Sequence, residues 1–456
     1  MNAQLTEGQE VHFIGIGGIG VSGLAQLALK YGYKVSGSDV RRSAVTDKLS
    51  GLGARIHIGH QAEYVQGCAL VVYSSAIRPD NPERREALRR GIPVIRRAEF
   101  LSDLMQDKTV ITVTGAHGKT TTSSMAAKLL LTAGLNPTVA VGGILREDGD
   151  NMKFGDSPYF VAEADESDGT FLCYEPTYSL ITNIDQEHLD HYGTYENLLK
   201  AFETFAGQTK PQGCVIYCSE DRVLSDIVLK SGARSVSYGQ GGEVCARNIS
   251  FAACRLSFDC VFGDDVVGPV SMSLIGRHNV SNALAIAALG RELGLDFGVI
   301  QRALREFKGV ERRFQIKYET KDICVVDDYA HHPTEIEATI SSAKLCGRGR
   351  VVVVFQPHRF SRTRLLLERF SKSFLHCDEL FITDIYGAGE DPLEGVTAGA
   401  LTQKVRQELS VPVTYSPRDG LVEEVLSRVR TNDLVLFLGA GDITKVSDEF
   451  AKRLQR

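Results

Sequence analysis

The segment from Thr114 to Thr121 combines residue types that bind phosphate groups in proteins. It reads Thr-Gly-Ala-His-Gly-Lys-Thr-Thr after the apolar run at 109–113, and this order predicts a strand, a tight loop and a helix. Main-chain N–H groups at such a helix start face the phosphates, while Lys119 neutralises charge and Thr120 can bind magnesium. The first glycine lies closer to the Gly-Lys pair than in the usual phosphate loop, so this is a shortened variant. The predicted nucleotide contacts are Gly115, His117, Gly118, Lys119, Thr120 and Thr121.

A second glycine motif lies near the start of the chain. Gly15, Gly17 and Gly20 form Gly-x-Gly-x-x-Gly between an apolar run that begins at Val11 and a predicted helix at about 21–31. The missing side chains let a diphosphate approach the N–H groups of the helix start. Asp39 ends the next predicted strand, at a spacing that suits an acid bonding a ribose hydroxyl. The motif favours a nucleotide or nucleotide-sugar site over a simple tight turn, and it does not separate NAD from UDP.

Acidic side chains follow two predicted strands downstream of the phosphate loop. The first group includes Glu163 and Asp168, and the second runs from Asp185 to Asp190. Carboxylates together with phosphate oxygens are the ligands that magnesium prefers, although Asp168 and Asp190 could equally be solvated caps. His188 and His191 have a spacing that could bind zinc, but with no third soft ligand nearby a magnesium or phosphate role is favoured.

The second half of the chain contains three further polar groups. His278, Asn279 and Asn282 lie at the predicted start of a helix, where they could cap it or contact a purine. Two more groups, 327–333 and 356–362, follow predicted strands, and ligands of open α/β sheets gather at such ends. If this segment is helical, Arg359 and Arg362 share one face and could hold a carboxylate or phosphate.

These groups need a scaffold that brings strand ends together. Three times an apolar run ends in a polar or glycine-rich turn and continues into a helical pattern, at 11–31, 109–133 and 322–335. This repetition predicts parallel α/β sheets and three domains, with boundaries near 107 and 310. The charged segment 96–108 predicts a helical linker. Apolar and polar residues alternate on either side of Gly263, and this pattern predicts an antiparallel hairpin within the middle domain.

Composition limits the class of protein. The 456 residues include 51 Lys and Arg against 57 Asp and Glu, and a net charge of −6 argues against a nucleic-acid-binding surface. The sequence shows no apolar run long enough for a membrane span and no secretion signal, which predicts a cytoplasmic protein. In that compartment the ten cysteines are expected to be reduced thiols.

Taken together and in order, the blocks GIGGIG, TGAHGKTTT, EADESD, TNIDQEHLD, GRHN, ERRF, DDYAHHPTE and QPHRFSRTR resemble the ATP-dependent Mur ligase family over essentially the whole chain. The resemblance implies an N-terminal Rossmann-like domain (1–107) that binds a UDP-sugar. It further implies a central P-loop ATPase domain (108–310) with a parallel sheet and a smaller antiparallel one, and a C-terminal Rossmann-like domain (311–456) that binds an amino acid.

The reaction that the resemblance implies is an ATP-dependent ligation in peptidoglycan precursor synthesis. ATP and Mg²⁺ would convert the lactoyl carboxylate of UDP-N-acetylmuramate into an acyl phosphate, and the amine of L-alanine would displace phosphate. The protein would act on these small molecules as a monomer or weak homodimer, without nucleic acid or membrane partners.

Site residues follow from the same resemblance. Lys119, Glu163 and His188 would be catalytic, with Thr120 and Glu163 holding one magnesium ion and His188 a second. Residues near the nucleotide would be His278, Asn279, Asn282, Arg313 and Asp328. The UDP-sugar would contact Gly17, Gly18, Ile19, Gly20, Asp39 and Ser75. The L-alanine end would comprise Tyr329, His331, Arg359 and Arg362.

Three other functions explain parts of the sequence. A recycling ligase that adds a preformed tripeptide to the same UDP-sugar would share most of these blocks. A nicotinamide-dependent dehydrogenase would explain Gly15 to Asp39 but leaves the phosphate loop without a purpose. A nucleotide-sensing module would need the loop to bind ATP with no reacting carboxylate nearby.

Overall fold

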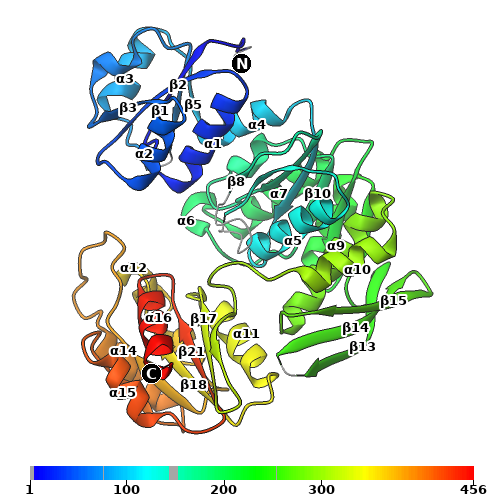
Figure 1. Ribbon diagram of the computed structural model, residues 1–456, viewed down its shortest axis with the longest axis vertical. Helices are drawn as coiled ribbons and strands as arrows, with labels where there is room; N and C mark the ends of the chain where they lie inside the picture. Colours follow the sequence, from blue (N-terminus) through cyan, green and yellow to red (C-terminus); the bar gives the residue numbers. More distant parts are fainter. Residues whose placement is uncertain (1–4, 75, 143–151, 253, 456) are drawn as a thin grey trace. The chain divides into compact units, whose positions relative to one another are not determined.

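A computed structural model describes residues 5–74, 76–142, 152–252 and 254–455 (Figure 1). Contacts divide the chain into two compact units, of which the first ends at Ser237 and the second begins at Tyr238. The parallel sheets of each unit carry helices between their strands, as the repeated strand-turn-helix pattern predicts.

The first unit opens with a five-stranded parallel sheet in the order β3-β2-β1-β4-β5. Its strands are β1 (Glu10–Ile14), β2 (Lys34–Asp39), β3 (Arg55–Ile58), β4 (Leu70–Tyr73) and β5 (Val94–Arg96). Its helices are α1 (Ile19–Lys30), α2 (Ala44–Gly51) and α3 (Pro82–Arg89), with a short 3-10 turn, η1 (Ala62–Val65). Helix α1 begins two residues earlier than predicted.

The predicted linker helix is α4 (Arg97–Met105). Its apolar side is buried through Phe100 and Leu104, and the Phe100 ring packs edge-on against Phe13 of β1 at 5.6 Å between centroids. The segment is therefore an integral helix of the first unit rather than a solvated connection.

The second sheet of this unit carries the phosphate loop. From β12 to β8 the order is β12-β11-β10-β6-β9-β7-β8, and the pairs that flank β6 are parallel. The strands are β6 (Thr109–Thr114), β7 (Thr138–Ala140), β8 (Met152–Lys153), β9 (Tyr159–Glu163), β10 (Tyr178–Ile181), β11 (Cys214–Cys218) and β12 (Ser235–Tyr238). The helices are α5 (Lys119–Thr132), α6 (Leu189–Tyr192), α7 (Tyr195–Gly207) and α8 (Arg222–Ser231), with a 3-10 turn, η2 (Thr170–Cys173).

The second unit begins with the antiparallel strands that the alternating pattern predicted. They are β13 (Val244–Ala252), β14 (Arg255–Phe262) and β15 (Asp265–Met272), and Gly263 turns the chain between the last two with a positive φ of 61°. Helices α9 (Arg277–Glu292) and α10 (Phe297–Glu306) follow. The hairpin prediction is confirmed.

A six-stranded sheet forms the rest of this unit, in the order β16-β17-β21-β18-β19-β20 with only β16 antiparallel to its neighbour. The strands are β16 (Gln315–Glu319), β17 (Ile323–Asp328), β18 (Arg350–Phe355), β19 (Glu379–Ile382), β20 (Val413–Tyr415) and β21 (Asp433–Leu438). The helices are α11 (Pro333–Lys344), α12 (Phe360–Leu365), α13 (Leu367–Phe370), α14 (Ala398–Glu408), α15 (Leu421–Arg428) and α16 (Ile443–Leu454).

The near-continuous apolar strands of this sheet are buried on both faces. In β18, Val351 and Val353 belong to one hydrophobic cluster, which includes side chains of α11 and α14. Val352 and Val354 belong to the other, which includes side chains of α15 and α16. Alternate side chains of a strand point to opposite faces, and helices cover both faces of such parallel sheets.

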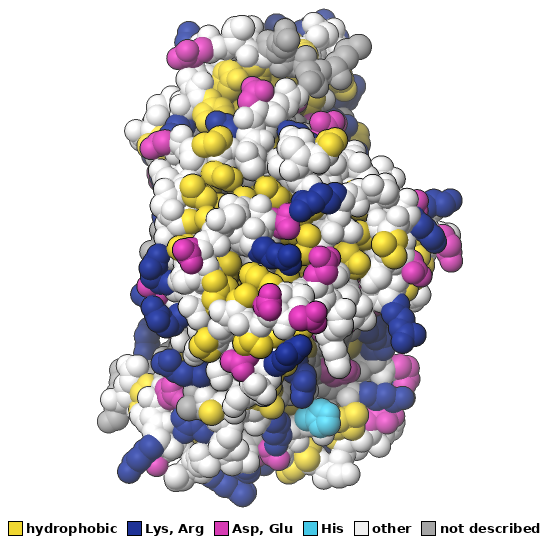
Figure 2. Space-filling model, turned by 90° about the vertical axis from the view of Figure 1, so that its right-hand side faces the viewer, with side chains coloured by type: hydrophobic (Ala, Val, Ile, Leu, Met, Phe, Trp, Pro, Cys, Tyr) yellow, Lys and Arg dark blue, Asp and Glu magenta, His cyan; other side chains and the backbone are white. Residues whose placement is uncertain are grey.

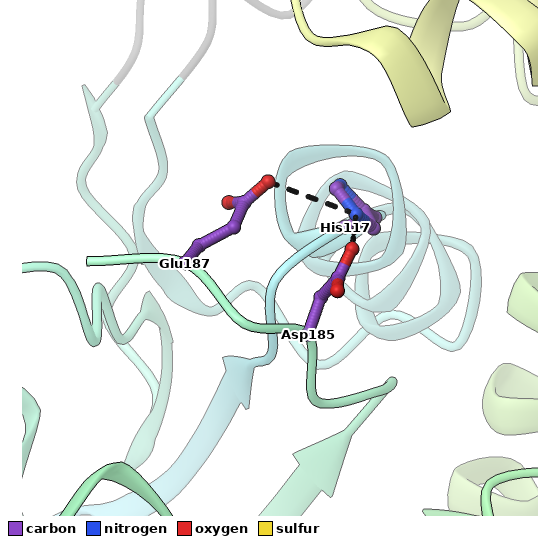
Figure 3. A group of neighbouring side chains, drawn as sticks. All are labelled: His117, Asp185 and Glu187. Carbon is purple, nitrogen blue, oxygen red and sulfur yellow. Dashed lines mark hydrogen bonds and ion pairs between the residues drawn. The ribbon is translucent and has the colours of Figure 1, made fainter. Parts of the chain in front are cut away.

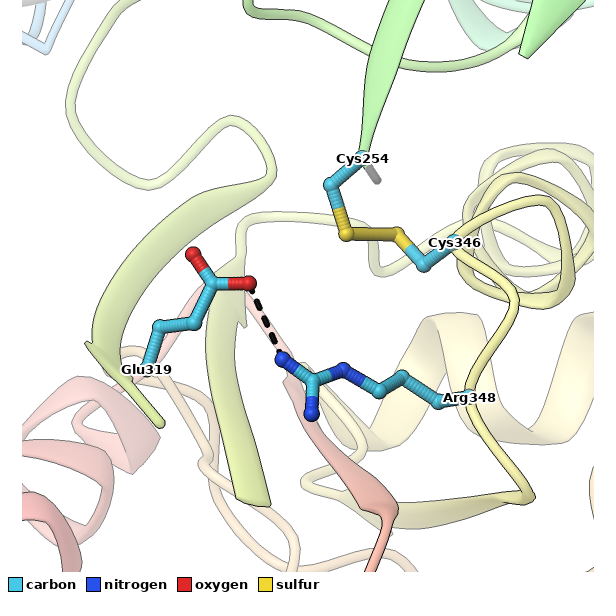
Figure 4. Close-up of a disulfide and its surroundings, with 4 residues drawn as sticks. All are labelled: Cys254, Glu319, Cys346 and Arg348. Carbon is cyan, nitrogen blue, oxygen red and sulfur yellow. Dashed lines mark hydrogen bonds and ion pairs between the residues drawn. A yellow bond between two sulfur atoms is a disulfide. The ribbon is translucent and has the colours of Figure 1, made fainter. Parts of the chain in front are cut away.

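The expectation that all ten cysteines are reduced thiols is wrong for one pair. Cys254, at the start of the turn into β14, forms a disulfide with Cys346, which follows α11 (Figure 4). The fold places these residues side by side although 92 positions separate them, a proximity that spacing along the chain does not reveal. Arg348 pairs with Glu319 nearby, at 3.0 Å. The other eight cysteines lie outside disulfides.

Positive and negative side chains are interspersed on the face drawn in Figure 2, with no region of a single sign. This distribution agrees with the near-balanced numbers of acidic and basic residues. Within the described ranges, no helix combines the length and apolar character needed to cross a bilayer.

Candidate active site

The phosphate loop joins β6 to α5 and depends on two glycines with positive φ. Gly115 has a φ of 127° and Gly118, at the N-cap of α5, has a φ of 86°. A Cβ atom on Gly115 would lie 2.3 Å from the Thr182 hydroxyl, so only glycine fits there. No side chain caps α5 at its N-cap. The N–H groups of its first turn are therefore oriented toward a ligand at the helix start.

Two residues that were not predicted brace this loop from the end of β10. Asn183 accepts a hydrogen bond from the main-chain N–H of His117 at 2.9 Å and donates one to its carbonyl at 3.0 Å. The Thr182 hydroxyl donates to the same carbonyl at 2.6 Å. The sequence signals were their position after an apolar strand and their place at the start of the block TNIDQEHLD.

Lys119 points back over its own loop and toward the acidic segment after β9. Its ammonium donates to the carbonyl of Gly115 at 2.7 Å and to Glu166 at 2.8 Å. Burial acts to lower the pKa of Lys119, but the Glu166 charge outweighs it and the pKa is raised. The lysine is therefore a fixed positive charge of the loop. Glu166 was not predicted as a site residue.

Thr120 and Glu163 meet as predicted for a magnesium site. The Thr120 hydroxyl donates to one Glu163 oxygen at 3.1 Å, and the other oxygen accepts from the Gly142 N–H at 2.9 Å. A hydroxyl and a carboxylate are hard oxygen donors of the kind that magnesium binds beside substrate phosphates. The donor set fits this ion.

His188 lies on the same side of the loop. It precedes α6 with a positive φ of 59°, and its Nε2 atom lies 3.7 Å from a Glu166 oxygen. The structure therefore gathers Lys119 and His188 around one carboxylate. His191 lies apart from this group, close to Gly169. No cluster of metal-ligating residues among the described residues contains both histidines.

A third polar cluster adjoins the loop (Figure 3). The His117 Nε2 atom lies 3.2 Å from Asp185 and 3.9 Å from Glu187, both of which follow β10. Their ligand atoms lie within 4.8 Å of one another, close enough to share a cation. His117 was predicted as a nucleotide contact, and its ring here is held by the acidic segment.

The glycine motif of the first sheet is organised by Asp39. The Gly17 N–H donates to an Asp39 oxygen at 2.9 Å, and a Cβ atom on Gly17 would lie 2.8 Å from that oxygen. Gly18 is the uncapped N-cap of α1, which leaves this helix start suited to an anion. Gly20 and Ile19 begin α1, and Ser75 lies outside the described residues.

A buried network behind this motif was not predicted. Glu83, in the first turn of α3, accepts hydrogen bonds from His12 at 2.6 Å, His60 at 2.6 Å and Ser38 at 2.8 Å. Burial alone would raise the pKa of Glu83, but these hydrogen bonds outweigh it and lower the pKa. The Ser38 carbonyl accepts from the N–H of Gly15 at 2.9 Å, so the network supports the glycine loop.

In the second unit, the predicted nucleotide contacts fall at the start of α9. Asn279 and Asn282 are buried, and their amides form a chain in which Asn282 donates to Asn279, and Asn279 to the carbonyl of Ile275. His278 lies beside Asn279 at 3.1 Å. The placement at the helix start is confirmed, while a purine contact stays a prediction.

Asp328, at the end of β17, fixes the segment that carries Arg313. One carboxylate oxygen accepts from the Phe314 N–H at 2.6 Å and the other from Ala330 at 2.8 Å. Burial raises the pKa of Asp328 to about 6. Arg313 lies over the Tyr329 ring, at 5.3 Å from its centroid.

Aromatic rings gather at the carboxyl ends of β17 and β18. The His331 ring contacts Tyr329 and also His358, with centroids 5.2 and 5.7 Å apart, and Arg362 reaches His358 at 3.2 Å. Burial, followed by His331 and the nearby arginines, lowers the pKa of His358 to about 4, so the ring is neutral near pH 7. His358 was not predicted as a site residue.

The condition under which Arg359 and Arg362 would share a helix face is not met, because only Arg362 lies within a helix. Helix α12 begins at Phe360, and Arg359 precedes it with a φ of 69°. The Arg359 N–H donates to the Tyr386 carbonyl at 2.8 Å, which holds the chain out of the helix at this residue. A shared helix face therefore does not set the direction of the Arg359 side chain.

The chain has the features of a multidomain ligase: a nucleotide-type glycine loop, a phosphate loop and a separate α/β sheet with arginines at its strand ends. It belongs to the Mur ligase family. Three family models match it in succession. The model described as "Mur ligase family, catalytic domain" matches residues 10–109, "Mur ligase middle domain" matches 113–290 and "Mur ligase, glutamate ligase domain" matches 312–441.

Individual relatives narrow the class. The UDP-N-acetylmuramate--L-alanine ligase of Anaeromyxobacter dehalogenans is 46% identical over 449 residues, which cover 98% of each chain. A solved UDP-N-acetylmuramate-alanine ligase from Thermotoga maritima is 32% identical with a TM-score of 0.81, covering 98% of this chain and 99% of that one. A murein peptide ligase from Psychrobacter arcticus is 24% identical with a TM-score of 0.65, over 98% and 99% of the chains, and shows the fold alone.

Proposed function

We propose that this chain is an ATP-dependent ligase that joins L-alanine to the lactoyl carboxylate of UDP-N-acetylmuramate, a step of peptidoglycan precursor synthesis. The observation that carries this proposal is the phosphate loop with Lys119 at the start of α5 and the Thr120–Glu163 pair beside it. The 46% identity over 98% of the Anaeromyxobacter dehalogenans enzyme supports the choice of substrates.

The first chemical step brings two anions together. A carboxylate oxygen of the sugar attacks the γ-phosphorus of ATP, and the bond from that phosphorus to the ADP oxygen breaks. Positive charge that is already in place lowers the barrier for such a transfer. Lys119 supplies that charge from the loop, and the N–H groups of the first turn of α5 orient the phosphates.

Magnesium would be held by Thr120 and Glu163, with a second ion at His188. When bound, it would screen the charge of the phosphate oxygens during transfer. The hydroxyl and carboxylate donors of the first pair suit this ion. The histidine position stays a prediction.

The second step forms the amide bond. The amine nitrogen of L-alanine attacks the acyl carbon and loses a proton, the bond from that carbon to the phosphate oxygen breaks, and phosphate leaves. We assign the carboxylate of L-alanine to Arg359 and Arg362, beside Tyr329 and His331. Because the ring of His358 next to Arg362 is neutral, the guanidinium groups supply positive charge for this carboxylate.

The UDP-sugar is assigned to the first sheet. Gly17, Gly18 and Gly20 open the helix start of α1 to a diphosphate, and Asp39 lies at its edge. We assign the three domains to 1–107, 108–310 and 311–456. The nucleotide contacts of His278, Asn279, Asn282, Arg313 and Asp328 stay predictions.

The alternatives have less support. The recycling tripeptide ligase is favoured by likenesses at 24% identity (TM-score 0.65) and at 29% identity over 67% of this chain (TM-score 0.61), against 32% identity and a TM-score of 0.81 for the alanine-adding structure. A dehydrogenase leaves the phosphate loop unexplained. A nucleotide sensor leaves the arginine cluster of the second unit unexplained.

Phosphate release in the presence of ATP and magnesium tests the proposal. We expect release only when UDP-N-acetylmuramate and L-alanine are both present, and no release when either is omitted. Release with a tripeptide but not with L-alanine would favour the recycling ligase, and NADH consumption would favour the dehydrogenase. ATP binding without product in any mixture would favour the sensor.

A further inference from the structure

Glu166 occupies the position where a phosphate group would be expected to meet Lys119. One of its oxygens accepts from the Lys119 ammonium at 2.8 Å, and the side chain is only 3% exposed. The same ammonium donates to the carbonyls of Gly115 at 2.7 Å and Ala116 at 3.4 Å. An ammonium has three donors. All three are therefore engaged by the protein in this structure.

The buried carboxylate of Glu166 is stabilised mainly by the Lys119 ammonium. Its second oxygen, Oε2, is buried and has no hydrogen-bond partner among the described residues. The His188 Nε2 atom lies 3.7 Å from Oε1. A buried carboxylate that loses its charged partner is strongly destabilised. Withdrawing Lys119 from Glu166 is therefore unfavourable unless a new partner replaces it.

The main chain prevents Glu166 from turning out to solvent. The Tyr192 hydroxyl donates to the Glu166 carbonyl at 2.5 Å, and the Gly169 N–H donates to it at 3.2 Å. The residue itself is 2% exposed. Glu166 is thus held in a buried position with its carboxyl group aimed at the loop, unlike a surface carboxylate that water could solvate. Burial raises the pKa of Glu166, and the charge of the adjacent Lys119 ammonium opposes that rise.

We propose that Glu166 is a positioning residue that holds the Lys119 ammonium over the phosphate loop and competes with the phosphates of ATP for it, so that it sets the affinity for ATP. The proposal rests on the proposed function only in requiring that the loop binds ATP. When ATP binds, its phosphates must share the Lys119 ammonium with Glu166 or displace Glu166 from it. The loss of the Lys119–Glu166 contact opposes binding and lowers the affinity for ATP.

The test is the dissociation constant of ATP with magnesium, measured by calorimetry on the full chain without UDP-sugar. Glu166→Gln keeps the shape and removes the charge, so we expect ATP to bind about tenfold more tightly than to the wild type. Glu166→Asp keeps the charge but moves it away from the Lys119 ammonium. We expect this variant also to bind ATP more tightly than the wild type, by a smaller factor than Glu166→Gln. The KM for ATP should fall in both variants while the KM for the UDP-sugar stays unchanged.

Asp165→Asn is the matched control. Asp165 is an acidic residue of the same segment, but its carboxylate accepts a hydrogen bond from the N–H of Ser167 at 3.1 Å rather than from Lys119. We expect less than a twofold change in ATP affinity, which separates the contact from a general loss of negative charge. Thermal unfolding of each variant checks folding.

Weaker ATP binding by a folded Glu166→Gln protein would overturn the proposal, because it would mean that Glu166 supports the nucleotide. An unchanged dissociation constant, or equal tightening in Asp165→Asn, would overturn it as well. A wild-type protein that binds no ATP would instead contradict the proposed function itself.

Discussion

At the scale of single residues, chemistry depends on charges that the chain places before any ligand arrives. Lys119 is fixed over the phosphate loop, and Arg362 is fixed against a neutral His358 ring. A preorganised charge stabilises a transition state without reorganisation at the moment of reaction. The functional residues are therefore those whose surroundings fix both the charge state and the orientation of the side chain.

Arg359→Ala tests the assignment of the L-alanine carboxylate. Loss of one charged hydrogen-bonding group from a carboxylate site should raise the KM for L-alanine about tenfold or more and leave the KM for ATP unchanged. Arg364→Ala is the control, because Arg364 is an exposed residue of α12. Equal KM values for L-alanine in the two variants would contradict the assignment of Arg359 to the L-alanine carboxylate.

His358 should make stability depend on pH. Its pKa of about 4 in the folded chain lies below the ordinary value of 6.5, so between these values only the unfolded chain binds the proton. Stability is therefore lost as the pH falls from about 6.5 to 4, by about 1–2 kcal/mol after allowance for partial exposure. Denaturant unfolding of the wild type and His358→Gln at pH 7 and pH 4.5 measures the effect. An equal loss in both proteins would contradict it.

At the scale of elements, the phosphate loop works because the end of β10 packs against it. Thr182 and Asn183 follow that strand and bind the main chain of His117. They hold the loop in the conformation that Gly115 and Gly118 permit. The loop and its brace thus form one unit although more than sixty residues separate them along the chain.

Gly115→Ala tests this packing. Its Cβ atom would collide with the Thr182 hydroxyl at 2.3 Å, at a φ of 127°, so we expect a loss of at least about 2 kcal/mol of stability and weaker ATP binding. Gly134→Ala is the control, because Gly134 also has a positive φ but nothing lies within 4 Å of the added atom. It should cost about 1 kcal/mol and leave ATP binding unchanged. Equal effects of both substitutions on ATP binding would refute the bracing role.

Motifs with local physical causes could be predicted from the sequence. The strand-loop-helix at 109–132, the hairpin around Gly263 and the existence of helix α9 follow from periodicity and turn residues, although α9 begins at Arg277, three residues before the predicted Val280. Asn183, Glu166, Glu83 and His358 could not, because their roles arise from contacts with distant segments. The positive φ of Arg359 was missed for the same reason, since a contact with Tyr386 sets it.

At the scale of the whole molecule, a covalent link joins parts that the family models separate. Cys254 lies within the range matched by the middle-domain model and Cys346 within that of the following model. A disulfide that links residues 92 positions apart strongly reduces the number of conformations open to the unfolded chain. The disulfide therefore contributes to the stability of the second unit as a whole.

Removal of the disulfide should lower stability. We expect the Cys254→Ser/Cys346→Ser double variant to lose about 2–4 kcal/mol, visible as a lower thermal midpoint. Dithiothreitol should shift the wild type toward the same midpoint and leave the double variant unchanged. A wild-type midpoint that does not respond to reductant under conditions in which thiol counting shows full reduction would contradict this.

The most direct test of the central claim follows an oxygen atom. If the phosphate loop delivers the γ-phosphoryl group of ATP to the sugar carboxylate, an ¹⁸O label in that carboxylate must pass into inorganic phosphate when L-alanine displaces it. We predict one labelled oxygen in each phosphate released by the wild type, no label in AMP, and no labelled phosphate from Lys119→Ala. Unlabelled phosphate released together with the amide product would contradict the account.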